Sequence, residues 1–353
     1  MHGNAVIRVT VKVKKGLRRR HRLSILNRRM AVRVSAGVDG KKAAIGRKEA
    51  KHMFGECHMH MFMNGENYRR AVELHRNGVQ EDDIRKKLQQ YRDMGITFLR
   101  DGGDALGVSA FAAALAPEYG ITYRTPLFAI HRNGHYGGIV GFGFDTWEEY
   151  HALVKRVKAE GGDFIKVMFS GIMDFGTDGS VSEEPLPPED IRRMIGIAHD
   201  EGMAVMAHVN GARTVQAAVE AGLDSVEHGN FVDEECLHAM AESHAVWIPT
   251  FVTITNLIGS GRFDDKVIRS LKKRQGSMIR EGFRLGVKIG LGSDAGAYRV
   301  MHGQGVYDEY REFCSLLGIS DHVPDLPVME KGELDHRLAE AETLIQRKFS
   351  YRG

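Results

Sequence analysis

The sequence contains few cysteines and no long apolar segment. Only three of its 353 residues are cysteine, an odd number without a recognisable spacing, which argues against a disulfide-stabilised secreted fold and favours a reducing compartment. No apolar run approaches the roughly 18 residues that a membrane-spanning helix requires. The N-terminus lacks the apolar core of a secretory signal. We therefore expect a cytoplasmic protein.

The composition also lacks the biases of disordered and fibrous proteins. Hydrophobic residues make up 42% and charged residues 27% of the chain, with 41 glycines and 8 prolines. These proportions are ordinary for a globular protein and exclude a collagen-like repeat. The length allows one large domain or two modest ones with a sizeable core.

Positive charge is concentrated at the N-terminus. Residues 1–52 contain sixteen Lys and Arg against two acidic residues, whereas the remaining 301 residues carry 33 basic and 44 acidic side chains. A basic arm can bind nucleic acid or an anionic membrane. However, apolar residues alternate with polar ones from Ile7 to Val13, which is typical of a half-buried strand. We expect a small β unit or a solvated tail here, with no membrane partner and with nucleic-acid binding as the alternative.

From residue 53 onward, short β-rich apolar segments alternate with helical patterns. Eight strands are predicted, at 53–60, 96–101, 122–131, 164–169, 204–208, 225–228, 246–251 and 287–294. The main helices are predicted between them, at 81–94, 147–160, 188–201, 213–221, 234–243 and 272–285. Five of these helices are followed by a glycine suited to the position after a helix end, namely Gly95, Gly161, Gly202, Gly222 and Gly286.

This alternation predicts an α/β fold built from parallel strands with right-handed crossovers. Eight β/α units match a TIM barrel, (β/α)8, whose usual length is about 250 residues. An open doubly wound sheet requires a glycine-rich phosphate turn after its first strand, and the segment from Cys57 to His60 is not one. We therefore expect three parts: the basic segment 1–52, a barrel at 53–316 and a C-terminal helical extension at 317–353.

Potential metal ligands stand at the ends of the predicted strands, and in a barrel these ends meet at one rim. His58 and His60 end the first strand, and residues two apart on a strand face the same side. Lys166 lies in the fourth predicted strand. His208, His228 and Asp294 stand at the ends of the fifth, sixth and eighth predicted strands, respectively. Each of these residues alone has an ordinary structural explanation, such as a salt bridge or a helix cap. Their combination predicts a metal centre, and imidazole and oxygen ligands suit Zn²⁺, with Mn²⁺ or Fe²⁺ as alternatives.

The order His-x-His, Lys, His, His, Asp resembles that of the binuclear amidohydrolase superfamily. The similarity is greatest to imidazolonepropionase-like and Xaa-Pro dipeptidase-like members. The matching segments lie between about residues 53 and 303, at 55–60, 164–171, 207–211, 217–230 and 292–296.

The resemblance implies a centre with two metal ions. One ion is expected on His58, His60 and Asp294, and the other on His208 and His228. Lys166 is expected to carry a CO₂-derived carbamate that bridges both ions. With an unmodified Lys166, the site is expected to hold one metal.

The same resemblance implies an enzyme that hydrolyses a C–N bond in an amide, a peptide-like substrate or a cyclic amide. A hydroxide bridging the metals attacks the carbonyl, and Asp294 serves as general base and then as general acid. His135, in the glycine-rich loop 131–138, resembles a family histidine that approaches the substrate carbonyl, and is expected to be a second catalytic residue. Four further residues on predicted rim loops are candidates for binding a substrate carboxylate, namely Arg132, Tyr136, Arg299 and His302.

Two features depart from the family pattern. Val209-Asn210 replaces the aromatic pattern that follows the fifth-strand histidine in dipeptidase-like relatives, which argues against dipeptide specificity. The C-terminal segment has a helical pattern, whereas relatives form a β-sandwich from both chain ends. The alternative functions are a mononuclear deaminase or imidazolone-type ring hydrolase, and a non-enzymatic metal-binding scaffold. We also expect a small-molecule substrate and a homo-oligomer.

Overall fold

The computed structural model describes residues 54–319 and 329–351. The basic segment 1–52, and with it the strand predicted near Ile7, lies outside the described residues. The strands are β1 (Glu56–Met59), β2 (Phe98–Asp101), β3 (Thr122–Arg124), β4 (Ala129–Arg132), β5 (Gly141–Phe144), β6 (Ile165–Met168), β7 (Val205–Val209), β8 (Ser225–His228) and β9 (Val246–Ile248).

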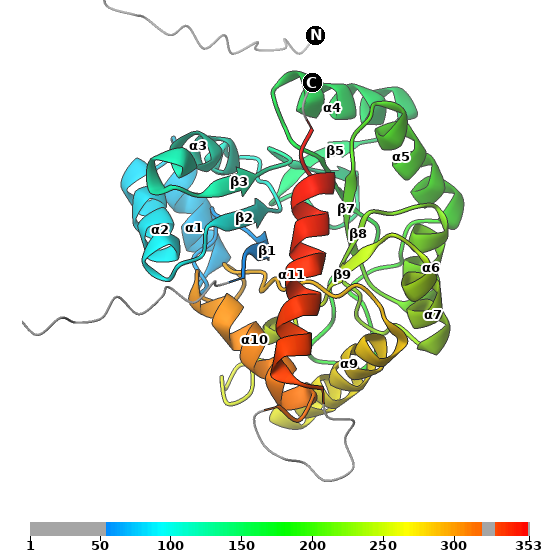
Figure 1. Ribbon diagram of the computed structural model, residues 1–353. Coiled ribbons are helices and arrows are strands. Elements are labelled where there is room, and N and C mark those ends of the chain that lie inside the picture. The colour runs from blue at the N-terminus through cyan, green and yellow to red at the C-terminus, as the bar shows by residue number, and fades with distance from the viewer. Residues whose placement is uncertain (1–53, 320–328, 352–353) are drawn as a thin grey trace, which may run out of the picture. The chain divides into compact units, whose positions relative to one another are not determined.

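Helices follow most of the strands (Figure 1). The first helices are α1 (Tyr68–His75), α2 (Glu81–Asp93) and α3 (Val108–Leu115), with a short 3₁₀ turn η1 (Ala116–Tyr119). The middle of the chain contains α4 (Trp147–Ala159), α5 (Pro188–Asp200), α6 (Ala212–Glu220) and α7 (Glu234–Glu242). The last four helices are α8 (Val252–Thr255), α9 (Asp265–Leu285), α10 (Gln304–Leu316) and α11 (Lys331–Lys348).

The named strands pair in parallel and form two sheets. One sheet has the order β1-β2-β3, and the other has the order β5-β4-β6-β7-β8-β9. The α/β alternation and the parallel pairing predicted from the sequence are therefore confirmed. The described strands are divided between these two sheets and do not form a single continuous one.

The predicted strand 122–131 is divided into β3 and β4. Pro126 has no N–H to donate to a neighbouring strand, and Leu127 has a positive φ of 66° that no extended strand allows. β3 pairs with β2, whereas β4 pairs with β5 and β6. The interruption therefore falls where the chain passes from one sheet to the other. β5 was not predicted, and its alternating glycines (Gly141 and Gly143) explain why the β-rich pattern is weak there.

The predicted eighth strand, 287–294, is not a regular strand. This segment makes isolated parallel bridges instead, between Trp247 and Ile289 and between Met59 and Ala295. The backbone N–H of Trp247 donates to Lys288 O at 2.8 Å, and that of Cys57 donates to Leu291 O at 3.0 Å. A side chain at Gly292 would lie 2.5 Å from Ile248 Cγ2 and 2.9 Å from His58 N. The segment thus lies between β9 and β1, and at position 292 the space between them admits only glycine.

The six main predicted helices are present as α2, α4, α5, α6, α7 and α9. Five of them begin and end within one residue of the predicted bounds. α9 ends where predicted but begins at Asp265 instead of residue 272, because Asp264 caps it by accepting the N–H of Lys266. The five glycines predicted after helix ends all have positive φ, between 75° and 88°. These positions confirm the predicted helix ends.

The C-terminal helix α11 packs against the strands. Its buried apolar side chains include Leu334, Leu338 and Ile345, so the helical pattern predicted for the C-terminal segment is present as an amphipathic helix. Ala341, Ile345 and Phe349 form one apolar cluster with residues of the strand region, among them Phe98, Phe164, Met206 and Val246. Figure 1 shows α11 crossing in front of the strands. Among the described helices, none combines the length and the apolar character of a membrane span.

Candidate metal centre

The side chains predicted to bind metal come together at the carboxyl ends of the strands. His58 lies in β1 and His60 directly after it, while Lys166, His208 and His228 lie in β6, β7 and β8. Asp294 lies in the segment between β9 and β1. The four histidines and Lys166 are buried, and the Asp294 side chain is 16% exposed. All six side chains therefore lie at one end of the sheets.

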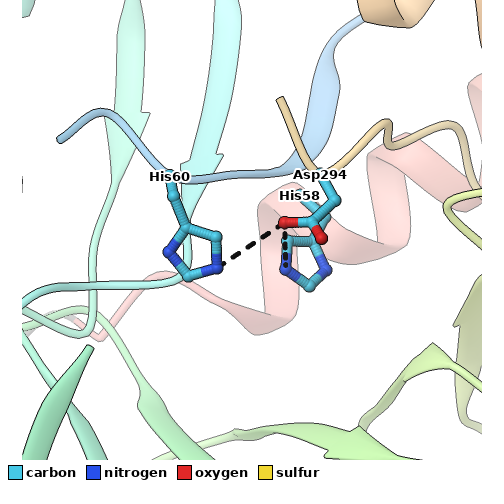
Figure 2. Close-up of side chains that lie close together, drawn as sticks. All are labelled: His58, His60 and Asp294. Carbon is cyan, nitrogen blue, oxygen red and sulfur yellow. Dashed lines mark ion pairs between the residues drawn. The ribbon is translucent and has the colours of Figure 1, made fainter. Parts of the chain in front are cut away.

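His58, His60 and Asp294 form the tightest group (Figure 2). The Asp294 Oδ1 atom lies 3.6 Å from His58 Nε2 and 3.7 Å from His60 Nε2. One potential ligand atom from each residue lies within 4.8 Å of the others. These distances suit three ligands around a single cation better than direct hydrogen bonds.

His208 and His228 extend this group. Their ring centroids lie 4.6 Å apart, and the His228 ring lies 5.0 Å from the His58 ring. Three buried polar atoms in this region have no hydrogen-bond partner among the described residues, namely His58 Nε2, Lys166 Nζ and Asp294 Oδ1. Buried polar atoms are rarely left without a partner. Their convergence fits a metal-binding site. A bound cation would give His58 Nε2 and Asp294 Oδ1 a partner, and a group bound to the cation would give one to Lys166 Nζ.

Each imidazole has one ring nitrogen engaged by a neighbouring group, which leaves its other nitrogen free. His58 Nδ1 lies 2.6 Å from Glu227 Oε2, and His60 Nδ1 lies 3.3 Å from Gly103 O. His208 Nε2 lies 3.1 Å from Gly171 O, and His228 Nδ1 lies 2.7 Å from Thr250 Oγ1. Metal-ligating histidines are typically oriented in this way by the groups behind them.

Three residues of the site have positive φ angles. His228 has a φ of 65°, Asp294 of 59° and Thr250 of 48°. Such angles are uncommon outside glycine, and strained for a β-branched residue such as threonine. The carbonyl of His228 accepts hydrogen bonds from Trp247 Nε1 at 2.9 Å and Gln275 Nε2 at 3.2 Å, so the surrounding structure holds this unusual conformation.

The strain at His228 has a geometric consequence. Alternation along β8 would direct His228 and Glu227 to opposite faces. Yet Glu227 is hydrogen-bonded to His58, and the His228 ring lies beside the same imidazole. The left-handed backbone at His228 accounts for this arrangement, because it turns the side chain away from the direction that a regular strand imposes.

Burial keeps the four histidines neutral. Desolvation, followed by the positive charge of Lys166, lowers the pKa of His60 and of His208 to about 3. Desolvation also places the pKa values of His58 and His228 well below the ordinary value. Neutral imidazole is the form that binds metals. Burial likewise lowers the pKa of Lys166 and raises that of Asp294.

A cavity of about 1290 Å³ opens onto this group. It is lined by His60, Lys166, His208, His228 and Asp294. The predicted catalytic residue His135 and one of the four predicted substrate residues, Tyr136, line it as well. The Tyr136 ring lies 5.0 Å from the His208 ring. His135 Nδ1 lies 3.5 Å from Glu183 Oε1. These two residues therefore stand beside the potential ligands.

The other three predicted substrate residues lie outside the lining of this cavity. Arg132 lies 3.6 Å from Asp190 and over the ring of Phe144. Arg299 lines a separate cavity of about 620 Å³. His302 is buried, and its two ring nitrogens contact Tyr91 Oη at 3.0 Å and Met63 O at 2.8 Å. With both ring nitrogens engaged, His302 holds the loop after β1.

Sequence reasoning assigned no role to two residues that contact the histidines. Thr250 lies beyond the end of β9, and a single threonine after a strand carries no recognisable signal. Glu227 immediately precedes His228 in β8. An acidic residue inside an apolar strand is a signal that it has a buried partner.

A family comparison agrees with this geometry. Residues 56–307 match the model of the amidohydrolase family. The chain belongs to the amidohydrolase family. The matched range contains all six predicted ligands, so the cluster at the strand ends is part of the region that defines this family. The presence of a His58, His60 and Asp294 group indicates a metal-dependent member.

Relatives in the family are similar over part of their lengths. An uncharacterized protein of Mycobacterium tuberculosis is 25% identical over 241 residues, which are 64% of this chain and 61% of that protein. Ochratoxinase of Aspergillus niger is 29% identical over 156 residues, 42% of this chain and 32% of ochratoxinase. The chain thus spans less than two thirds of the length of these relatives.

Solved structures of other proteins share the fold. A Xaa-Pro dipeptidase with bound methionine superposes with a TM-score of 0.63 at 20% identity, covering 84% of this chain and 75% of that one. The structure of A. niger ochratoxinase gives a TM-score of 0.59 at 20% identity, covering 74% and 66%. The fold shared by these structures is TIM-barrel-like.

Proposed function

We propose that this protein is a metal-dependent hydrolase that cleaves a C–N bond in an amide, peptide-like or cyclic amide substrate. The observation that carries the proposal is the group of four buried histidines, Asp294 and Lys166, of which all but His58 line one cavity. Three buried polar atoms of this group lack a hydrogen-bond partner among the described residues. Family membership supports the same conclusion.

We further infer that the two sheets are arcs of one (β/α)8 barrel. The chain passes directly from β3 to β4 and so joins the two sheets on one side. On the other side, residues 288–295 hydrogen-bond both to β9 and to β1. A closed arrangement explains how β1 and β8, which lie in different sheets, bring His58 and His228 into contact.

The proposed centre holds two metal ions. His58, His60 and Asp294 would hold one ion, and His208 and His228 the other. We assign Zn²⁺, with Mn²⁺ or Fe²⁺ as alternatives, because neutral imidazole and oxygen ligands suit these ions. When bound, the ions would lower the pKa of water and polarise the substrate carbonyl.

Lys166 is proposed to carry a carbamate between the two metal positions. Its amine is buried and has no hydrogen-bond partner among the described residues, and burial favours its neutral form. In this reaction the neutral amine adds to the carbon of CO₂, a C–N bond forms and one proton is released. The resulting carboxylate would supply the anionic ligand that the histidines do not.

Asp294 is assigned as general base and acid. Its carboxylate borders the cavity, so it can accept a proton from the attacking water and deliver it to the leaving nitrogen. Tyr136 and His135 line the same cavity, and we propose that they orient the substrate carbonyl. Desolvation raises the pKa of Tyr136 above its ordinary value, so the phenol keeps its proton and can donate a hydrogen bond.

The cavity favours a substrate with a bulky apolar group. Beyond the potential ligands, its lining includes the apolar side chains of Ile172, Phe175, Leu257, Phe263 and Tyr298, together with charged residues such as Arg69 and Arg262. Its volume of about 1290 Å³ exceeds the roughly 300–1,000 Å³ of common small-molecule sites. We therefore expect N-acyl amino acids and cyclic amides with large side groups to be better substrates than small dipeptides.

Metal analysis followed by a substrate screen tests the proposal. Protein purified without chelators should contain two equivalents of divalent metal, and its intact mass under native conditions should include a carbamate. Assays should then compare N-acyl amino acids, dipeptides and lactams. One metal equivalent with unmodified Lys166 would favour the mononuclear alternative, and a metal-free protein without hydrolytic activity would refute the assignment.

An Asp294→Asn variant tests the assigned general base. Because asparagine cannot accept the proton, kcat should fall by about 10²- to 10⁴-fold while the fold is retained. Asp174→Asn is the matched control, since Asp174 borders the same cavity and its Oδ1 accepts only the backbone N–H of Gly176. Near-normal turnover by Asp294→Asn would exclude Asp294 as the base.

A further inference from the structure

A buried charged pair lies behind His58. Arg100 in β2 and Glu227 in β8 are both fully buried. Arg100 Nη2 donates to Glu227 Oε1 at 2.9 Å and to Ser225 Oγ at 3.1 Å, and Arg100 Nε donates to Cys57 O at 2.6 Å. The pair therefore links three strands, β1, β2 and β8, directly beneath the potential metal ligands.

The second oxygen of Glu227 is directed to His58. Glu227 Oε2 lies 2.6 Å from His58 Nδ1. A carboxylate only accepts hydrogen bonds, so His58 Nδ1 must carry the proton, and Nε2 is left with its lone pair. That Nε2 atom is the one that lies 3.6 Å from Asp294 Oδ1. Glu227 thus selects the form of His58 that can bind a metal.

Stability alone does not explain this pair. Burying two charges costs about as much free energy as their attraction returns, so such pairs contribute little to folding compared with apolar residues of the same size. Moreover, Arg100 Nη1 has no hydrogen-bond partner among the described residues. A pair that is costly and incompletely satisfied points to a role in positioning its neighbour.

Helix α11 and the residue after it complete the arrangement. Phe349 follows α11 directly, and its ring centroid lies 4.5 Å from Arg100 Cζ. Phe349 is itself fully buried and packs edge to face on Phe164, with ring centroids 5.2 Å apart. The aromatic face both attracts the guanidinium and keeps water from it. The C-terminal helix is in this way connected to His58 through Arg100 and Glu227.

We propose that Arg100 and Glu227 are positioning residues that hold His58 as a metal ligand, and that Phe349 holds Arg100 in place. This inference rests on the metal centre proposed above. It assigns the C-terminal segment a function in metal binding in addition to covering one end of the strands.

Glu227→Gln is the first test. A glutamine that accepts from His58 Nδ1 must turn its NH₂ group toward Arg100, where it opposes another donor. Zn²⁺ affinity, measured by chelator competition on metal-reconstituted protein, should fall by about 10- to 100-fold. The absorption spectrum of the Co²⁺-substituted protein should also change, because the geometry at His58 changes.

Glu309→Gln is the matched control. Glu309 is an equally buried carboxylate, but it accepts the backbone N–H groups of Phe251 and Val252, each at 2.8 Å, and contacts no ligand. This variant should lose stability without losing Zn²⁺ affinity. Equal losses of Zn²⁺ affinity in both variants would mean that Glu227 is merely structural, and would overturn the inference.

Phe349→Leu provides a test that does not disturb the charges. Leucine keeps the site apolar but removes the aromatic face, so Zn²⁺ affinity should fall by about 2- to 10-fold. Ile345→Val, in the same apolar cluster but without an aromatic face, should leave it unchanged. If both Glu227→Gln and Phe349→Leu bind Zn²⁺ as tightly as the wild type, this inference is overturned but the proposed function is not. If the wild-type protein itself does not bind Zn²⁺, the proposed function is overturned as well.

Discussion

At the scale of single residues, the centre depends on side chains that hold the histidines as much as on the histidines themselves. Thr250 shows this most clearly. It adopts a φ of 48°, which is unfavourable for a β-branched residue. Its Oγ1 lies 2.7 Å from His228 Nδ1, and its carbonyl accepts the N–H of Thr253 at 3.0 Å. The strained backbone is compensated by contacts that orient His228.

A Thr250→Val variant should weaken metal binding. Valine keeps the shape and the β-branched backbone cost of threonine but removes the partner of His228 Nδ1. We expect Zn²⁺ affinity to fall by about 10- to 100-fold, with the melting temperature of the metal-free protein nearly unchanged. Chelator competition and thermal unfolding measure the two quantities.

Thr255→Val is the matched control for Thr250. Thr255 is also buried and lies in α8, but its hydroxyl has no hydrogen-bond partner among the described residues. Its substitution should leave metal affinity at the wild-type value. An equal decrease in both variants would show that Thr250 acts through general packing and not through His228.

At the scale of secondary-structure elements, α11 is attached by polar contacts as well as by its apolar face. Glu342 accepts the N–H of Gly55 at 2.8 Å, just before β1. Lys348 Nζ, at the end of α11, donates to Asp224 Oδ1 at 3.1 Å. Asp224 also accepts from His199 in α5 and from the backbone N–H of Val205 in β7. One carboxylate therefore connects α11 to the β7 and α5 region.

The contribution of Asp224 should depend on pH. Burial by itself raises its pKa, but the hydrogen bonds from His199 and Val205 and the charge of Lys348 outweigh burial and lower the pKa below 3.8. A depressed folded-state pKa means that the stabilisation is fully present above about pH 4 and is lost as the pH falls through the folded-state pKa.

Asp224→Asn should therefore be destabilised by about 1 to 3 kcal/mol at pH 7, and this difference from the wild type should shrink below about pH 4. Urea unfolding across this pH range measures the free energy of unfolding. Glu340→Gln, which alters an exposed ion pair with His336 in the same helix, should change it by less than about 0.5 kcal/mol. A destabilisation independent of pH would argue that the charge of Asp224 has no role.

At the scale of the whole molecule, metal binding and folding should be coupled. The ligands are separated by more than two hundred residues along the chain, from His58 to Asp294, and the described fold brings them together. Because an unfolded chain cannot present them jointly, metal binding to the folded state stabilises it.

Chelator treatment should lower the thermal stability of the protein. A ligand present at about 1,000 times its Kd contributes roughly 4 kcal/mol, so removal of the metal should lower the Tm by about 5 to 15 °C. Readdition of Zn²⁺ should restore it. His60→Asn should respond only weakly to the same treatment. A wild-type Tm that chelators leave unchanged would contradict the proposed centre.

Much of this description could be predicted from the local sequence. The carboxyl-terminal ends of five helices follow from glycines that adopt positive φ, which is a local feature. The strands with simple apolar patterns, such as those carrying Lys166 and His208, are likewise where the pattern predicts them. The histidine spacing in β1 and the position of Asp294 indicated the group that the structure assembles, because parallel strands carry their carboxyl ends to the same side.

Features that depend on residues distant in the chain were decided by the tertiary structure alone. The interruption at Pro126 and the irregular segment around Gly292 arise where one sheet meets the next, and β-rich composition does not encode that junction. The sequence makes His302 a candidate for substrate binding, but its hydrogen bonds to Tyr91 and Met63 are set by packing and are not visible in the sequence. The roles of Glu227, Arg100 and Thr250 depend on hydrogen bonds across strands and on backbone strain. Sequence specified which residues have the right chemistry, and the packing of distant strands determined which of them can act together.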